Sequence, residues 1–384
     1  MVVDASGTGL EVPEPVRLCC YLESTGMGGM EASLSTLLGH LDDRYEVTLL
    51  GVDLAILTAV AETRPGTRLR LVPPVKGKAD VRAIAAHVRA VRDLRPDVLM
   101  ASMGHLYRAP YAILAGLLNR VPTVAVAHSI MPPAYPFQEV LFGRLFCHLR
   151  GLAGVSAWVC EGAERALGLP PGMVTELVNG VPNTNWRGPS ASIDLGAALH
   201  TPTVGAVGRL APEKGYDVLI RAMTELPGCC LVLLGEGPER ARLTKLARQL
   251  GVEDRVELAG WIPSPWTDHF RFDVIAVPSS FEGFGLVAVE ALLAGIPVVA
   301  SRVGGLAEIV HDGETGLLVE PGDPSALAHA LRELLIDPAR RDVMGRRGRD
   351  DALQRFTPAA MASAYEAFLS SAISGHSRHP LSRR

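Results

Sequence analysis

A strand, a glycine turn and a helix follow one another in the stretch Val274-Ile275-Ala276-Val277-Pro278-Ser279-Ser280-Phe281-Glu282-Gly283-Phe284-Gly285-Leu286-Val287-Ala288-Val289-Glu290-Ala291. The helix N-terminus after the turn offers unpaired backbone N–H groups and a partial positive charge, and both suit a phosphate. Glu282 and Glu290 flank the turn, and an ionised carboxylate accepts hydrogen bonds from sugar or ribose hydroxyls. A site for phosphate and hydroxyls together indicates a nucleotide sugar as ligand.

The same alternation of apolar strands and helices continues along the chain in both directions. We expect helices at 30–41, at 79–94, up to 117, and at 358–370, where Thr357-Pro358 is typical of a helix start. Such alternation predicts two doubly wound α/β domains with parallel strands. Ligands of these sheets bind at the carboxyl ends of the strands, so two facing domains would enclose a cleft. The predicted strands are 16–22, 47–52, 69–72, 98–102, 123–127, 152–155, 203–207, 230–234, 256–258, 274–277, 298–300 and 317–319.

Composition narrows the class of protein. The chain has 384 residues, 48% of them hydrophobic, and a net charge of −4, so nothing indicates nucleic acid as the main partner. Its six cysteines form no CxxC pair, and we expect reduced, buried thiols in a cytosolic protein. No apolar run reaches the length of about 20 residues that a spanning helix needs, whereas a peripheral membrane contact stays open. Loose ends are expected at 1–15 and 375–384, and a linker at 180–200.

Two cations follow the first predicted strand of the second domain. The loop after 203–207 contains Gly208, Arg209 and Lys214. Arg as a planar fork and Lys as a point charge can clamp a diphosphate at the carboxyl end of a strand. A solvated surface pair is the alternative, because exposed Arg and Lys are common.

The two glutamates differ in their expected surroundings. Glu282 lies in the turn, whereas Glu290 falls inside an apolar helix, where an unpartnered carboxylate would be costly. We therefore expect Glu290 to meet a ligand hydroxyl or a fixed cation. A pair at this spacing also arises by chance.

The first domain carries weaker candidates. Gly28 and Gly29 open the first helix after the first strand, a place for a phosphate, but Glu31 occupies the third glycine position of a GxGxxG pattern, and a plain tight turn is the alternative. His128 ends the strand 123–127 and would face the cleft unless it is a structural histidine; His105 is a further candidate for the cleft wall.

Taken together, the chain resembles the retaining glycosyltransferases of family 4, which have the GT-B fold of two Rossmann-like domains facing across a cleft. The resemblance covers about 16–372 and is most specific in the second domain. There the motifs occur in the family's order, at 208–210 with 213–215, 235–237, 282–290, 297–300, 304–305, 308 and 313–316. The first domain matches more loosely, at 28–31, 128, 155–156 and 179–181. Pro182 and Met30 depart from the pattern.

The resemblance implies a division of roles. An acceptor-binding domain would comprise 1–190 and a crossover helix at about 357–374, and a donor-binding domain 195–356. Arg209 and Lys214 would hold the diphosphate, and Glu290 the ribose. Glu282 would contact the sugar ring. The remaining donor contacts would come from the backbone of Gly28, Gly29, Gly208, Gly283, Phe284, Gly285 and Leu286, and His128 would face the sugar near its C6 hydroxyl.

The implied reaction is retaining transfer of a hexose from a UDP- or GDP-sugar to a hydroxyl or amine. The acceptor would be a glycolipid, a polysaccharide or a small natural product. No DxD motif occurs, so we expect neither a metal nor a cofactor, and a cytoplasmic enzyme with an association with the inner face of the membrane left open. Three other classes stay open: a retaining glycosidase, a nucleotide-sugar epimerase on the same fold, and an NAD-dependent oxidoreductase. The phosphate features have no role in the first, and the interrupted glycine loop argues against the last.

Overall fold

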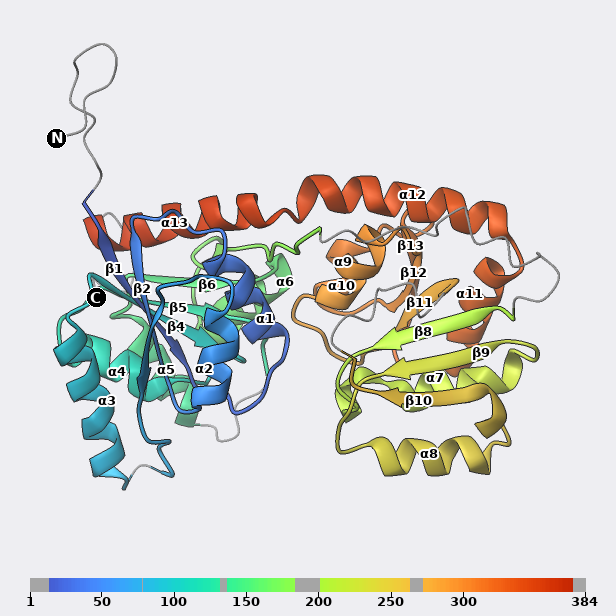
Figure 1. The fold of residues 1–384 in the computed structure, drawn as a ribbon, viewed down its shortest axis with the longest axis horizontal. Coiled ribbons are helices and arrows are strands. Elements are labelled where there is room, and N and C mark those ends of the chain that lie inside the picture. Colours follow the sequence, from blue (N-terminus) through green and yellow to red (C-terminus); the bar gives the residue numbers. More distant parts are fainter. Residues whose placement is uncertain (1–13, 78, 132–136, 184–200, 263–271, 376–384) are drawn as a thin grey trace, which may run out of the picture. The chain divides into compact units, whose positions relative to one another are not determined.

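The computed structural model describes residues 14–77, 79–131, 137–183, 201–262 and 272–375 (Figure 1). The chain divides into two compact units. The first unit is Met1–Ala153, Ala163–Thr175 and Ala362–Arg384, and the second unit is Gly154–Gly162 and Glu176–Met361. Most of the linker expected at 180–200 lies outside the described residues.

A seven-stranded sheet organises the first unit, in the order β3-β2-β1-β4-β5-β6-β7 (Figure 1). β1 pairs in parallel with both β2 and β4. The chain order therefore reverses between β1 and β4, where sheets of this kind bind ligands. The strands are β1 (Val16–Leu22), β2 (Tyr45–Gly51), β3 (Arg68–Leu71), β4 (Val98–Met103), β5 (Thr123–Ala127), β6 (Gly151–Gly154) and β7 (Thr175–Glu176).

In the described part of the first unit, five helices alternate with the strands along the chain: α1 (Gly29–Leu38), α2 (Leu54–Ala61), α3 (Val81–Leu94), α4 (Pro110–Leu118) and α5 (Phe137–Phe146). The helices α6 (Ala157–Leu167) and α13 (Pro358–Ser374) are shared between the units, and the first unit holds their residues from Ala163 and from Ala362 onward. α1 contacts α2, and α3 contacts α4. Cys19 and Cys20 of β1 are fully buried, and burial raises the pKa of both thiols, which suits inert core residues.

A six-stranded sheet organises the second unit, in the order β10-β9-β8-β11-β12-β13. All its described strand pairs are parallel. Here the order reverses between β8 and β11, whose residues Val204 and Val274 are register partners. The strands are β8 (Thr203–Val207), β9 (Cys230–Leu234), β10 (Val256–Gly260), β11 (Val274–Val277), β12 (Val298–Ser301) and β13 (Gly316–Val319).

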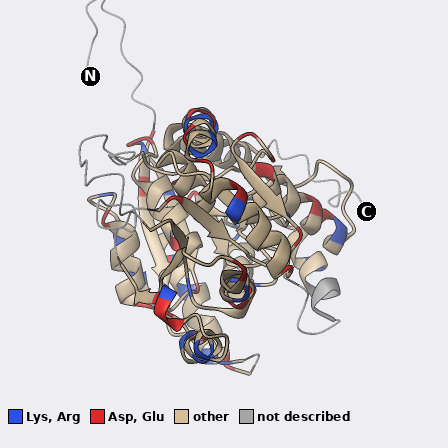
Figure 2. Cartoon of the chain, turned by 90° about the vertical axis from the view of Figure 1, so that its right-hand side faces the viewer, with Lys and Arg blue, Asp and Glu red and all other residues tan. Residues whose placement is uncertain are grey.

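The helices of the second unit pack against one another as well as on the sheet. α11 contacts α7 and α12, and α12 contacts α9. Figure 2 shows acidic and basic residues interspersed on the outer helices and loops, while the central strands carry almost no charge. The helices are α7 (Tyr216–Ala222), α8 (Arg240–Gln249), α9 (Leu286–Leu293), α10 (Leu306–Ile309), α11 (Pro324–Leu335) and α12 (Pro338–Arg355), and a 3-10 turn, η1 (Pro212–Lys214), precedes α7.

The predicted doubly wound sheets are confirmed, and each predicted strand is present with its ends shifted by at most two residues. Two local predictions are incomplete. The first helix ends at Leu38, and Leu41 is buried beyond its end. The helices α2, α5 and α6 and the short strand β7 were not predicted, although Asp53 caps α2 by accepting from the N–H groups of Ala55 and Ile56.

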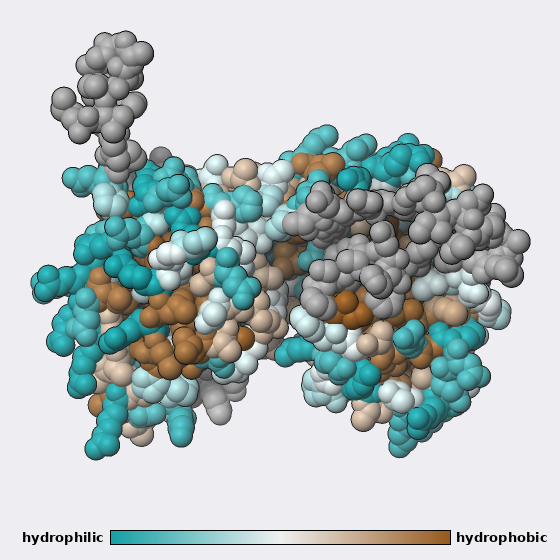
Figure 3. All heavy atoms as spheres, viewed as in Figure 1, coloured by the Kyte–Doolittle hydropathy of each residue, from teal (hydrophilic) through white to brown (hydrophobic). Residues whose placement is uncertain are grey.

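Apolar surface is exposed along one edge of the first unit. Figure 3 shows a patch of apolar atoms over the region of α2. Leu54 of α2 is 54% exposed, and the edge strand β3 exposes Leu69 and Leu71 between arginines. Charged side chains on an edge strand oppose unwanted pairing with another chain.

Candidate active site

The candidate site of the second unit lies where the strand order reverses. β8 and β11 are neighbours, and the loops that leave their carboxyl ends come together there (Figure 1). The N–H and the hydroxyl of Ser280 both donate to the carbonyl of Glu213, at 2.9 and 3.3 Å. These bonds fix the two loops to each other, so the predicted cations and the predicted glutamate turn share one place.

Gly208 begins the loop after β8 in a conformation that favours glycine. Its φ is +145°, and an added Cβ would meet the hydroxyl of Tyr216 at 2.8 Å. Burial, and then the charge of Glu282, raise the pKa of Tyr216 above its ordinary value. The same added Cβ would lie 3.9 Å from Lys214 Cε, so a longer side chain at Gly208 would crowd Lys214.

The two predicted cations have different surroundings. Arg209 is paired with Glu213 at 2.7 Å, but its side chain is 69% exposed. Lys214, the last residue of η1, is 25% exposed and pairs with Glu282 at 2.7 Å. Desolvation alone would raise the pKa of Glu213, but its own backbone N–H and the Arg209 guanidinium hold that pKa below its usual value. Lys214 is therefore the better ordered charge of the two.

Glu282 is the centre of the turn after β11. Its Oε2 accepts from Lys214 Nζ at 2.7 Å and from the Ser279 hydroxyl at 3.2 Å. Among the described residues, nothing donates to its other oxygen, Oε1. The side chain is only 17% exposed, so the carboxylate is held in place with one oxygen left for a further donor.

Hydrogen bonds from residues far away in sequence hold the turn Gly283-Phe284-Gly285 in place. The buried hydroxyl of Ser156 donates to the carbonyl of Gly283 at 2.7 Å. Gly305 N–H donates to the carbonyl of Glu282 at 3.1 Å. Gly285, with φ +113°, caps α9, and an added Cβ would lie 2.6 Å from Leu306. Hydrogen bonds from Ser156 and Gly305 thus fix the turn, and only glycine fits at position 285.

The start of α9 leaves backbone donors available. Ala288 and Val289 donate to the carbonyl of Gly285, but within the described residues the N–H groups of Leu286 and Val287 have no partner. These groups lie at the positive end of the helix dipole, next to Glu282 and Lys214. Phosphate is the ligand that such a helix start suits.

Glu290 lies in the second turn of α9 and is half-buried, less enclosed than its apolar neighbours led us to expect. The buried face of the helix is formed by Ala288, Val289, Ala291, Leu292 and Leu293. Glu290 therefore lies at the border of the buried face.

Sequence reasoning missed the support supplied by residues 154–162. Glu308 of α10 accepts from the N–H groups of Ala157 and Trp158, at 3.1 and 2.7 Å, and so caps α6. Trp158 packs edge-on against Phe281, with ring centroids 5.2 Å apart. A serine before a helix is a recognisable N-cap signal, but its partner in the glycine turn could not be read from the sequence.

The first unit brings its own candidates to the carboxyl ends of β1 and β4. Gly28 caps α1, Gly29 is its first residue, and Glu31 of the first turn is buried. The Glu23 carboxylate accepts from the N–H of Ala109 at 3.0 Å and so joins the loops after the two strands.

The two histidines predicted in this unit are both held toward the neutral form. Burial lowers the pKa of His128 to about 4. Burial also lowers the pKa of His105, and the charge of Arg108, which donates to its ring at 2.9 Å, adds to the effect. His128 follows β5, and its N–H donates to the carbonyl of Met103. In both rings the lowered pKa favours the neutral form, which can donate or accept a hydrogen bond.

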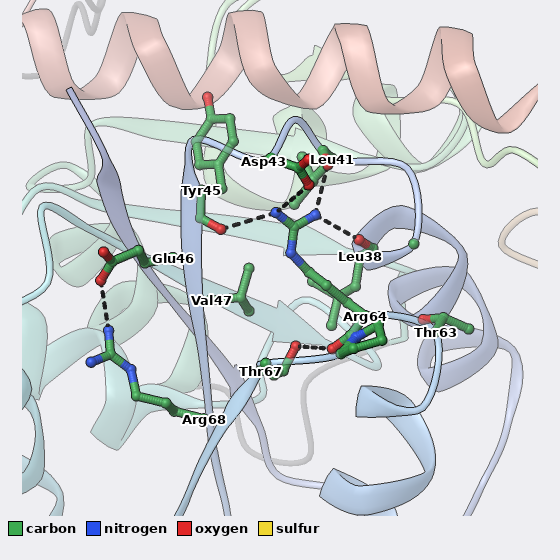
Figure 4. A pocket seen from close by; sticks show the side chains of 13 residues that line it. Leu38, Leu41, Asp43, Tyr45, Glu46, Val47, Thr63, Arg64, Thr67 and Arg68 are labelled. Atoms are coloured by element: carbon green, nitrogen blue, oxygen red, sulfur yellow. Dashed lines mark hydrogen bonds and ion pairs between the residues drawn. The ribbon is translucent and has the colours of Figure 1, made fainter. Parts of the chain in front are cut away.

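A hollow of about 640 Å³ lies elsewhere on the first unit, between the end of α1, β2 and β3 (Figure 4). The Arg64 guanidinium points into it and donates to four carbonyls, those of Leu38, Leu41, Asp42 and Tyr45. These four bonds hold the segment between the end of α1 and the start of β2. We therefore regard Arg64 as a structural residue, not as a ligand-binding cation.

The described part of the chain has neither a group of side chains suited to a metal ion nor a helix suited to spanning a membrane. No group of three His, Cys, Asp or Glu side chains there could hold a metal ion. None of the helices in the described ranges is long and apolar enough to cross a bilayer.

Comparisons with known proteins identify the family of this chain. A family described as glycosyl transferases group 1 matches residues 192–351, and glycosyltransferase family 4 matches residues 27–184. The chain is 30% identical to a GDP-mannose-dependent alpha-(1-6)-phosphatidylinositol monomannoside mannosyltransferase of Mycolicibacterium smegmatis, over 86% of this chain and 91% of that protein. This chain belongs to the group 1 glycosyltransferases.

Other relatives match this glycosyltransferase over part of their length. It is 37% identical to the lipopolysaccharide core biosynthesis glycosyltransferase LpsE of Rhizobium meliloti, over 46% of this chain and 52% of LpsE. A D-inositol 3-phosphate glycosyltransferase of Corynebacterium aurimucosum is 42% identical over 53% of this chain and 51% of the relative. The chain thus spans about half the length of these two curated relatives.

A solved structure shares the fold of this glycosyltransferase. Anabaena Alr3699/HepE in complex with UDP has a TM-score of 0.78 and 23% identity, over 93% of this chain and all of the other. The fold is therefore GT-B, with two parallel-sheet α/β domains, as the sequence predicted.

Proposed function

We propose that this glycosyltransferase moves a hexose from a UDP- or GDP-sugar to a hydroxyl or amine, with retention at the anomeric carbon and without a metal. The observation that carries the proposal is the junction of Lys214, Glu282 and the free N–H groups of α9 at one reversal point of a parallel sheet. The donors named for similar proteins support it: one is called GDP-mannose-dependent, and another was solved with UDP-glucose.

The charges at this junction match the charges of the reaction. As the bond between the anomeric carbon and the phosphate oxygen breaks, its electron pair leaves with the diphosphate, and the sugar becomes positive. The negative charge on the diphosphate would be stabilised by Lys214, Arg209 and the N-terminus of α9. The backbone of Gly208, Gly283, Phe284, Gly285 and Leu286 would complete this cradle.

The hydroxyl groups of the donor require acceptors. In this proposal Glu290 accepts from the ribose hydroxyls and Glu282 from the sugar ring. Gly28, Gly29 and His128 of the first unit would contribute further donor contacts, with His128 acting as a neutral group near the C6 hydroxyl.

No enzymic nucleophile is assigned, so we propose attack from the face that the diphosphate leaves. The acceptor oxygen bonds to the anomeric carbon and gives its proton to the departing phosphate oxygen. Configuration is then retained without a covalent sugar–enzyme intermediate. Product analysis by NMR would show an α-linkage from an α-linked donor; an inverted product would contradict this route.

A donor screen tests the proposed function most directly. Binding of UDP-, GDP- and NAD-type ligands is measured first, and mass spectrometry then follows products with glycolipid, polysaccharide and small-molecule acceptors. Transfer of a hexose to an acceptor supports the proposal. An epimerised donor in a reaction without acceptor would identify an epimerase instead, and binding of NAD alone would identify an oxidoreductase.

A further inference from the structure

Lys214 and Glu282 form an ion pair, although each is proposed to bind a different part of the donor. The proposed function assigns Lys214 to the diphosphate and Glu282 to the sugar ring. The structure joins these two side chains at 2.7 Å, with both largely withdrawn from solvent. A diphosphate that reaches Lys214 therefore meets an ammonium group that Glu282 already holds.

We propose that Glu282 determines specificity for the intact donor over the bare nucleotide, by an exchange of partners. Before the donor binds, Glu282 holds Lys214. On binding, the diphosphate takes Lys214, and the sugar hydroxyls donate to Glu282 in its place. This inference rests on the proposed function and adds a coupling between its two parts.

The surroundings of Glu282 make the exchange unequal for the two ligands. A carboxylate that is 17% exposed loses its main counter-charge when Lys214 turns to the phosphate, and an uncompensated, largely buried charge is costly. Ser279 remains as a donor at 3.2 Å, and Oε1 can accept a further bond. A nucleotide sugar supplies hydroxyl donors to this carboxylate, whereas UDP or GDP supplies none.

A second arrangement leads to a different result. An ammonium group has three donors, so Lys214 could bridge Glu282 and the phosphate at once. The carboxylate would then weaken nucleotide binding directly, through its charge near the phosphate, whether or not Lys214 is present. Removing Glu282 in a Lys214→Gln background separates the two arrangements, because only the exchange requires both partners.

The test is calorimetry with UDP, UDP-glucose, GDP and GDP-mannose on the full chain and on Glu282→Gln. Glutamine keeps the shape of the side chain and removes the charge that holds Lys214. We expect the variant to bind the nucleotide more tightly and the nucleotide sugar no more tightly. The preference for the nucleotide sugar should then fall about tenfold, the factor for an interaction worth about 1.4 kcal/mol.

Glu213→Gln is the matched control. It removes the carboxylate beside the other cation, Arg209, which is 69% exposed and so gains little from the pair. The preference for the nucleotide sugar should be unchanged in this variant.

The double variant Lys214→Gln/Glu282→Gln is a second test, because an exchange requires both partners. In the Lys214→Gln background, Glu282→Gln should no longer tighten nucleotide binding. An unchanged affinity ratio in a folded Glu282→Gln protein would overturn the exchange and the assignment of Glu282 to the sugar ring, and would leave the proposed transfer of a hexose standing. If the wild type binds none of the four ligands, the proposed function fails, and this inference fails with it.

Discussion

At the scale of single residues, Lys214 and Arg209 share a charge but not an environment. The Lys214 side chain is 25% exposed and fixed by Glu282, whereas Arg209 is 69% exposed. A preorganised charge in a partly dry site stabilises a developing negative charge more than a solvated one does. We therefore expect Lys214 to carry most of the cationic contribution to catalysis.

Lys214→Ala should lower kcat by about 100-fold to 1000-fold, the usual effect of losing one preorganised group that stabilises developing charge. Steady-state kinetics with the donor found by screening measures this effect. Lys245→Ala, at an exposed position of α8, is the control and should leave kcat unchanged. Near-normal turnover of Lys214→Ala would contradict the phosphate role.

Glu290→Ala should act mainly on nucleotide binding, because the proposed partner of Glu290 is the ribose. A hydrogen bond to a charged group contributes about 1.5–3 kcal/mol, so the Kd for UDP or GDP should rise by roughly ten- to 150-fold. Calorimetry measures it, with the exposed Glu257→Ala of β10 as control. Unchanged nucleotide affinity would show that Glu290 binds something else.

His128 gives a prediction for pH dependence. Burial lowers its pKa to about 4 from an ordinary value of 6.5. Because the folded-state pKa is depressed, His128 reduces stability as the pH falls from about 6.5 toward 4, and has no such effect above that window. NMR titration of the ring, assigned with His128→Asn, should give a midpoint near 4. A midpoint above 6 would contradict this effect of burial on the pKa of His128.

Most residues of the candidate site could be named from the sequence. Their glycine, lysine and glutamate motifs occur along the chain in the order typical of the family that the sequence resembles. The pairing of Lys214 with Glu282 was not predicted. Their separate roles follow from the resemblance, but a contact between residues 68 positions apart depends on the register of β8 with β11. The half-burial of Glu290 was also misjudged, because apolar neighbours in the sequence do not show which positions of a helix other elements cover.

At the scale of elements, the turn between β11 and α9 depends on a residue from another part of the chain. Ser156 is buried and supplies the hydrogen bond to the Gly283 carbonyl. Without it, that carbonyl and the turn around it would lose a fixed position. Ser156 is thus a positioning residue for the predicted phosphate cradle.

Ser156→Ala should weaken donor binding beyond its effect on stability. Loss of one partner of a buried hydrogen bond costs about 1–3 kcal/mol of folding free energy. Thr315→Ala is the matched control, because its buried hydroxyl accepts from the N–H of His311 away from the turn. Thermal unfolding should shift similarly in both variants, whereas the donor KM should rise only in Ser156→Ala. Equal KM values would make Ser156 purely structural.

The elements themselves were predictable to different degrees. Buried parallel strands are continuous apolar runs, so β1, β5, β8 and β11 match their predictions residue by residue. The helix α2 is apolar around its whole circumference and eight residues long, so it shows no amphipathic period. Its one clear signal was Asp53 as N-cap, which marks a start but not a helix.

At the scale of the whole molecule, the division of the chain into two units was the feature least predictable from the sequence. The sequence placed 154–162 with the first domain, whereas contacts group these residues with the second unit. The cause is long-range: Glu308 and the Gly283 carbonyl bind this segment through Ala157, Trp158 and Ser156. No local pattern reveals such partners.

Hydrogen exchange with and without a bound nucleotide tests where the donor acts on the whole chain. Ligand that binds only the native state stabilises it by about 2.7 kcal/mol at 100 times Kd, and local opening at the site is suppressed by up to that amount. The backbone of 208–215 and 279–290 should therefore gain protection, because the ligand would occupy the N–H groups at the start of α9 and stabilise the loop after β8.

The helix α3 of the first unit serves as the internal reference and should exchange at an unchanged rate. Lys214→Ala should lose the added protection at the same nucleotide concentration. Protection spread evenly over both units would mean a general stabilisation and would contradict a donor site built on the β8–β11 junction.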